Sequence, residues 1–305
     1  MKNYKTFLSI FVIYILINMV ISPAVYINQA FNGITAWAFN VLPSVLPFMF
    51  FTKVLTSLGT FNKISYILNK PCEKLYKTPP ISSLVFLTST ISGYPVGAKM
   101  TCDLYNQGVI TRSDAFKMTS FCSTSGPMFI IGAVGIGMLK NATYGYIIFF
   151  CHIVGALING LLYRNLKVKE LDNRTSSKPL KTFDLSSIIL DSALSIISVG
   201  AIIAIFFVII TCFSPIFDIF PPFLSSTFKG LIEITKGCID IATFIGNKWS
   251  ILATTFVISF GGISTIIQSL SMLNSVQIPF YLILLQKFTH AIISSLLALI
   301  FILFI

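Results

Sequence analysis

Small, hydroxyl-bearing and amide residues interrupt three apolar stretches of this sequence, and chemistry could occur at these interruptions. Peptide groups that leave a helix inside a bilayer can find partners only in protein atoms or in a water-filled cavity. We therefore expect the three breaks to hold a passing polar solute. The candidate binding residues are Ser92, Gly93, Tyr94, Pro95, Gly97 and Lys99 in the first break, Ser125, Gly126 and Pro127 in the second, and Gly261, Gly262, Ser264 and Gln268 in or just after the third.

Each of these groups also has an interpretation that needs no ligand. The hydroxyls and bare backbone before Pro127 could cradle a solute, but a proline-broken helix needs the same residue types to satisfy its own peptide groups. Gln268 follows Gly262 in an apolar run and could offer its amide to a substrate or cross-link two helices. Both interpretations stay open at this point.

A lysine lies in the first turn of the half-helix expected after Pro95. This lysine is Lys99, and Asp103 follows one turn later on the same face of the helix. This order is unfavourable for a helix, because the positive end of the helix dipole prefers an acid. A cation at a helix N-terminus strengthens an anion-attracting site. One hypothesis is therefore that Lys99 attracts an anionic substrate, and the alternative is that it reaches the membrane interface or pairs with Asp103.

Glu233 is the acid of greatest interest, because it lies in the segment GLIEITKG beside small residues in an apolar region. An acid within the membrane would point to coupling with a proton or another cation, and Asp103 is a second candidate for coupling. Lys229 and Lys236 flank Glu233, however, so an interfacial helix with salt bridges explains the segment equally well.

The sequence contains none of the common catalytic templates, such as HExxH, GxSxG or a Walker motif. The six cysteines are scattered without metal-ligand spacing. His152 and His290 are single histidines in apolar stretches, and packing is the simpler role for each. We expect no enzyme activity, no catalytic residue, no metal and no cofactor.

The composition indicates that the segments that hold these breaks in position are apolar helices. Of 305 residues, 55% are hydrophobic and only 10% are charged, with a mean hydropathy of +0.88. A soluble domain of this size carries far more charge. The fold class is therefore all-α, a polytopic membrane protein with discontinuous helices. The expected spans are Phe7–Ser22, Tyr144–Leu162, Leu185–Phe213, Ile251–Leu270 and Ile278–Ile305.

The net charge of +11 does not indicate nucleic-acid binding, because the basic residues gather at helix ends and in one connector. That distribution is typical of topology signals and of contacts with membrane lipids. The chain divides into a first transmembrane half with two broken helices (1–165), a cytoplasmic basic linker (166–184) and a second transmembrane half (185–305). The sequence leaves open whether the protein forms a homo-oligomer.

Two further features concern the arrangement of the helices. Prolines at positions 43 and 47 predict a broken or re-entrant helix in VLPSVLPFMFFTKVL. A shift of 167 residues places Ser83 on Ser250 and Ile91 on Ile258, so that the first and third breaks superpose. We therefore predict an inverted repeat whose broken helices meet at the binding site.

Several segments together resemble the YlbJ-type sporulation integral membrane proteins. The segments are SGYPVGAK, FCSTSGPMFIIGAVGIGML, GLIEITKG, SFGGISTIIQ and LPSVLPF, in the same order and across most of the chain. The Cys122–Thr124 run departs from the family pattern, which leads us to expect an asparagine there. That family belongs to a wider group with a nucleoside-recognition or gate domain, related distantly to concentrative nucleoside transporters.

The resemblance implies a function and a location. Such proteins act in endospore-forming bacteria, where they are associated with export of dipicolinic acid from the mother cell across the outer forespore membrane. The expected localisation is accordingly a bacterial cell membrane, in particular the outer forespore membrane. Two alternatives remain: a transporter of a nucleoside-type solute, and a membrane scaffold that helps to build the spore envelope.

Overall fold

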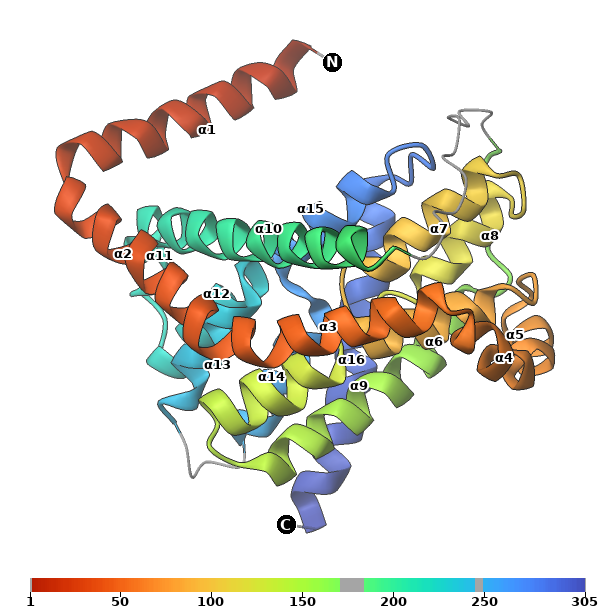
Figure 1. Ribbon diagram of the computed structural model, residues 1–305. Coiled ribbons are helices and arrows are strands. Elements are labelled where there is room, and N and C mark those ends of the chain that lie inside the picture. The colour runs from red at the N-terminus through yellow and green to blue at the C-terminus, as the bar shows by residue number, and fades with distance from the viewer. Residues whose placement is uncertain (1, 171–183, 245–248, 305) are drawn as a thin grey trace.

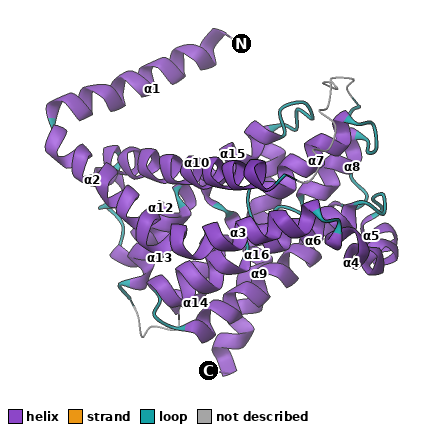
Figure 2. Cartoon of the chain, viewed as in Figure 1, coloured by secondary structure: helices purple, strands orange, loops and turns teal. Residues whose placement is uncertain are grey.

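The computed structural model describes residues 2–170, 184–244 and 249–304, and this part of the chain contains helices and no strand (Figures 1 and 2). The predicted all-α class is confirmed. The helices are α1 (Lys2–Ile21), α2 (Pro23–Ala36), α3 (Leu42–Ser57), α4 (Thr60–Ser65), α5 (Asn69–Tyr76), α6 (Ser82–Ser92), α7 (Val96–Asn106), α8 (Arg112–Thr119), α9 (Ala142–Tyr163), α10 (Leu185–Cys212), α11 (Ser214–Phe217), α12 (Pro222–Ile232), α13 (Ile234–Ala242), α14 (Trp249–Phe260), α15 (Gly262–Met272) and α16 (Phe280–Phe304), with π-helices at Trp37–Val41 and Met128–Met138 and a 3₁₀-helix at Tyr66–Leu68.

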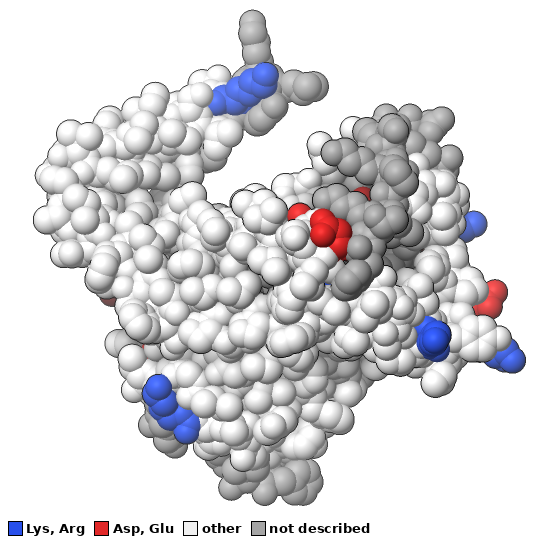
Figure 3. Space-filling view, in the orientation of Figure 1, with Lys and Arg blue, Asp and Glu red and all other residues white. Residues whose placement is uncertain are grey.

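Five stretches are long and apolar enough to cross a bilayer. Four of them match the predicted spans, and the fifth is Pro23–Ser57 in place of Phe7–Ser22, which is a shorter apolar helix. Helix α1 extends away from the body of the molecule (Figure 1). Most of the face drawn in Figure 3 is uncharged, with basic side chains in isolated spots and one acidic group in the upper middle of the view. The chain is a multi-pass integral membrane protein.

The prediction of a broken helix at Pro43 and Pro47 is wrong, because the chain remains helical from Pro23 to Ser57. A π-helix directly precedes α3, and Pro43 lies in the first turn of α3, where a missing N–H matters least. The hydroxyl of Ser44 donates to the carbonyl of Asn40 at 3.1 Å. Such local adjustments let a transmembrane helix keep its prolines.

The order of elements repeats along the chain. A long helix (α2–α3), a pair of short helices (α6 and α7), a broken helix (α8 and Met128–Met138) and a long helix (α9) are followed by α10, the pair α12 and α13, the broken helix α14–α15, and α16. This order pairs the first break with Glu233 and the second break with the third. The shift of 167 residues paired the first with the third, because chance identities are common between apolar segments.

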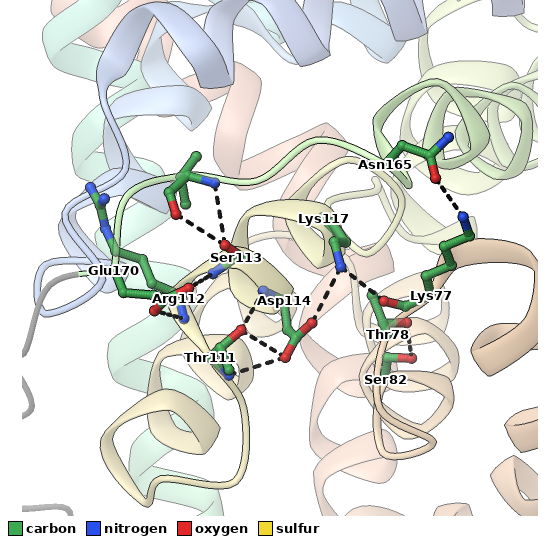
Figure 4. Close-up of polar contacts among 11 residues, drawn as sticks. Lys77, Thr78, Ser82, Thr111, Arg112, Ser113, Asp114, Lys117, Asn165 and Glu170 are labelled. Atoms are coloured by element: carbon green, nitrogen blue, oxygen red, sulfur yellow. Dashed lines mark hydrogen bonds and ion pairs between the residues drawn. The ribbon is translucent and has the colours of Figure 1, made fainter.

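A cluster around Arg112 ties three distant segments together, and Figure 4 shows its contacts with Glu170. Its buried guanidinium donates to the carbonyls of Val276 at 2.8 Å, of Gln277 and of Lys169. The carboxylate of Glu170 accepts from the backbone nitrogens of Arg112 and Ser113, each at 3.0 Å. The start of the predicted linker is therefore docked on α8, whereas its residues 171–183 lie outside the described residues.

Candidate functional site

The first break joins α6 to α7 through Gly93, Tyr94 and Pro95, and it contacts the second break directly. Gly93 has a φ of 76°, a conformation that favours glycine. A Cβ built on Gly93 would lie 2.7 Å from the backbone nitrogen of Gly126. Glycine at position 93 therefore permits both the turn and the contact between the two backbones.

The third break and the Glu233 segment complete the meeting point. A Cβ built on Gly261 would lie 3.2 Å from the hydroxyl of Tyr94 in the first break. One built on Gly262 would lie 3.3 Å from the backbone nitrogen of Ile234, next to Glu233. The three breaks and the Glu233 segment, which are distant from one another in the sequence, therefore meet at one place. A site that binds one solute through all of these segments requires such a meeting point.

A hollow with a cavity volume of about 90 Å³ lies where these breaks meet. The π-helix after the second break and the helices α3 and α10 provide most of its apolar wall, including the rings of Phe48 and Phe129. Polar groups enter from the breaks themselves. An apolar hollow with a few convergent polar groups is typical of small-molecule sites.

Two hydroxyls in the wall of the hollow have no protein partner among the described residues. Ser125 is 2% exposed and Ser264 is 1% exposed, and neither Oγ atom forms a hydrogen bond. Buried hydroxyls are normally paired, because leaving one unpaired costs about 1–3 kcal/mol. A solute or water in the hollow could supply the missing partners.

Glu233 lies in the wall of the hollow and is only 3% exposed. Its carboxylate accepts from the backbone nitrogen of Lys236 at 2.7 Å and caps α13. The flanking lysines do not neutralise it: Lys236 pairs with Asp240 at 2.7 Å, and the ammonium of Lys229 lies 5.9 Å from the ring centroid of Phe217. Glu233 is therefore in neither of the two ion pairs among the described residues.

The structure places most predicted site residues at the hollow. Those that line it are Ser92, Gly93, Tyr94, Pro95, Ser125, Gly126, Ser264 and Gln268, together with Glu233. Those outside its wall are Gly97, Lys99, Asp103, Pro127, Gly261 and Gly262. Gly261 and Gly262 form the turn behind the wall. A Cβ on Gly97 would lie 2.1 Å from the carbonyl oxygen of Cys122, so Gly97 serves close packing.

Lys99 does not enter the hollow, which corrects its expected position. It is exposed on α7, close enough to Lys53 and Asp103 for electrostatic interaction. The two ion pairs among the described residues do not include it. The reason is that Lys99 lies on the exposed face of α7, whereas Gly97 and Ala98 lie on its buried face.

Sequence reasoning missed residues that belong to other helices. Ser195 on α10 lines the hollow, and its hydroxyl accepts from the ammonium of Lys53 on α3 at 3.3 Å. Thr235 and Thr265 also line it. Lys53 lies on α3 beside this wall. The single signal in the sequence was a lysine inside an otherwise apolar stretch.

Comparisons with known proteins agree with this geometry. No protein-family model matches the chain. It is 29% identical over 160 residues to the "Sporulation integral membrane protein YlbJ" of Bacillus subtilis (strain 168), a match that covers 52% of this chain and 39% of the relative. The match thus spans well under half of that relative's length.

A solved structure has a similar fold over almost the whole chain. It is a variant of CNTnw, a nucleoside transporter, in an outward-facing state, with a TM-score of 0.60 and 13% sequence identity. The similarity covers 97% of this chain and 83% of that one. At this identity the likeness establishes the fold. The chain is thus a multi-pass, all-α membrane protein, related to the YlbJ-type sporulation integral membrane protein and folded like a nucleoside transporter.

Proposed function

We propose that this chain transports a small, aromatic, anionic solute, and that the solute is dipicolinate exported from the mother cell across the outer forespore membrane. The observation that carries transport is the convergence of broken helices at one apolar hollow, with the hydroxyls of Ser125 and Ser264 among the polar groups of its wall. Broken helices at a shared hollow are the arrangement by which transporters expose backbone to a solute.

The wall of the hollow supports an aromatic solute. Phe48, Tyr94 and Phe129 supply ring surfaces, against which a planar pyridine ring can pack. The hydroxyls and the amide of Gln268 can donate to carboxylate oxygens. Lys53, which reaches the wall through Ser195, adds positive charge near the mouth together with Lys99. These two lysines would attract an anion toward the hollow.

Glu233 supports coupling to protons in the same proposal. An ionised carboxylate in the wall would repel a dianion, since like charges in a medium of low dielectric interact strongly. Binding of the dianion is then favourable when Glu233 is protonated. The proton would enter with the solute or before it, and Asp103 beside Lys99 could pass it on. This is the coupling role expected of an acid at membrane depth.

Transport by purified protein in liposomes tests the proposal. Labelled dipicolinate should accumulate, and the rate should fall by about 25-fold in the variant Ser125→Ala/Ser264→Ala, which removes two hydrogen bonds to the solute. The matched control is Ser250→Ala, because Ser250 is also buried and unpartnered but lies outside the hollow. Equal rates in all three proteins would contradict the proposal.

A nucleoside-type solute is the second candidate. No lysine or arginine lines the hollow in the described part of the chain, and a neutral ring compound would fit such a wall. Labelled uridine in the same liposomes separates the two. Uptake of uridine but not of dipicolinate would show that the transported solute is neutral and not anionic.

The scaffold alternative is tested in cells. A deletion strain should accumulate dipicolinate in the mother cell and lack it in the spore. Ser125→Ala/Ser264→Ala should lower the dipicolinate content of the spore at normal protein abundance, because these changes remove no protein hydrogen bond. Spores that are misassembled but contain normal dipicolinate would favour a scaffold.

A further inference from the structure

A buried lysine connects two of the breaks, and neither the proposed substrate site nor the coupling acid uses it. Lys287 lies in α16, an apolar helix long enough to span a bilayer, and is 4% exposed. A charged side chain at such a place is costly and is retained when it has a specific function.

The neighbours of the Lys287 ammonium are neutral. It donates to the backbone carbonyl of Ser123 in the second break and to the hydroxyl of Tyr94 in the first. It also lies 4.6 Å from the centroid of the Tyr94 ring. The hydroxyl of Tyr94 donates to the same carbonyl at 2.9 Å. Carbonyl and hydroxyl oxygens with an aromatic face are groups that bind a monovalent cation.

No carboxylate balances this charge among the described residues. Both ion pairs found there, Lys117–Asp114 and Lys236–Asp240, lie elsewhere. The carbonyl of Ser123 lies in the segment between α8 and the π-helix Met128–Met138, and it accepts from both Lys287 and Tyr94. The broken helix therefore provides a cation site, and the ammonium of Lys287 occupies it.

Two histidines face the same region, and both are engaged in other contacts. The Nε2 atom of His152 accepts from the backbone nitrogen of Ser125 at 3.0 Å, so the ring is neutral and its Nδ1 donates to the hydroxyl of Ser259 at 2.9 Å. The Nε2 atom of His290 contacts the carbonyl of His152 at 2.9 Å. Tyr94 is the remaining titratable group in contact with Lys287.

We infer that the Lys287 ammonium is a tethered cation that holds the first and second breaks together, in a place where a dissociable monovalent cation would otherwise bind. The inference does not depend on the identity of the solute. It makes Lys287 a positioning residue, since it acts through Tyr94 and Ser123. An untethered cation could leave this place, whereas a tethered one keeps the two breaks joined whatever the salt composition.

The thiol of Cys122, next to Ser123, reports on this junction. Cys122 is 1% exposed, and Cys238, buried at 0% on α13, is the internal control. The experiment measures alkylation of both thiols in purified full-length protein by a small maleimide, resolved by mass spectrometry. Lys287→Ala should raise the Cys122 rate by about tenfold, as expected for loss of a charge-assisted hydrogen bond. The rate at Cys238 should stay unchanged.

Added ethylammonium should restore protection of Cys122 in Lys287→Ala, with a saturable dependence on concentration. The control is Lys287→Met, which fills the space of the lysine stem without charge and should not respond. Unchanged Cys122 labelling in Lys287→Ala overturns the inference. So does raised labelling that ethylammonium leaves unaltered, or an equal response in Lys287→Met.

A milder variant covers the case in which Lys287→Ala does not fold. Tyr94→Phe keeps the ring but removes two hydrogen bonds, the one that Lys287 donates to the hydroxyl and the one that the hydroxyl donates to Ser123. It should raise Cys122 labelling by about tenfold. Labelling equal to that of the unmodified protein would overturn the inference in that case.

Discussion

The cluster around Arg112 and the hollow between the breaks both bury polar groups, but these groups differ in whether they have hydrogen-bond partners. The guanidinium of Arg112 donates to three carbonyls, and the nearby carboxylate of Glu170 accepts from two backbone nitrogens. At the hollow, the hydroxyls of Ser125 and Ser264 have no partner among the described residues. Satisfied groups hold segments in place, whereas unsatisfied ones are available to a ligand. Substitutions at the two regions should therefore change different properties.

The largest effect is expected where the backbones of two breaks touch. Gly93→Ala should lower the free energy of unfolding by about 3 kcal/mol or more, because the new Cβ meets the backbone of Gly126 and the φ is positive. The matched control is Gly59→Ala, which has a φ of 70° but only the side chain of Asn62 nearby at 3.7 Å. Thermal unfolding of both variants measures the difference. Equal losses would show that the contact between the breaks is unimportant.

Removing the guanidinium of Arg112 should destabilise the protein without altering the hollow. Arg112→Met leaves three carbonyls without their donor, and a loss of about 2–4 kcal/mol is expected. The control is Arg164→Met, at the half-buried C-cap of α9. Solute affinity of the surviving folded fraction, measured by calorimetry, should not change. A large fall in affinity would mean that the two regions are coupled.

Removal of the hydroxyl of Ser125 or Ser264 should have the opposite effect to Arg112→Met, with weaker solute binding and unchanged stability. Ser125→Ala and Ser264→Ala should each weaken solute binding by about fivefold, the effect of one neutral hydrogen bond. The melting temperature should stay within about 1 °C, because no protein hydrogen bond is lost. Isothermal titration and thermal unfolding on the same preparations measure both. A destabilised variant with normal binding would reverse the comparison.

The smallest effect concerns the pH dependence at Glu170. Burial raises the pKa of this carboxyl, but hydrogen bonds from Ser113 and Arg112 outweigh burial and leave it below its ordinary value of 4.5. Its contribution to stability is therefore complete above that pH and is lost as the pH falls through the lowered pKa. Glu170 is exposed, so Glu170→Gln should shift the melting temperature by about 1 °C at pH 7. The shift should vanish at low pH, and a shift that grows on acidification would contradict this sign.

Local chemistry predicted the breaks well because it creates them. Gly93 with Pro95, and Gly261 with Gly262, end helices through their own backbone preferences, and these effects act within a few residues. The same reasoning failed at Pro43 and Pro47, where neighbouring side chains and a π-helix absorbed the prolines. It also placed Lys99 in the site, although the direction of a side chain depends on how α7 is set against its neighbours.

The amino-acid sequence by itself determined the membrane class, the apolar spans and the positions at which helices are interrupted. Only the tertiary structure decided which breaks meet, that Ser195 lines the hollow and accepts from Lys53, and that Lys287 joins Tyr94 to Ser123. The reason is physical. A break follows from short-range steric and hydrogen-bonding rules, whereas convergence depends on the packing of helices that are far apart in the chain.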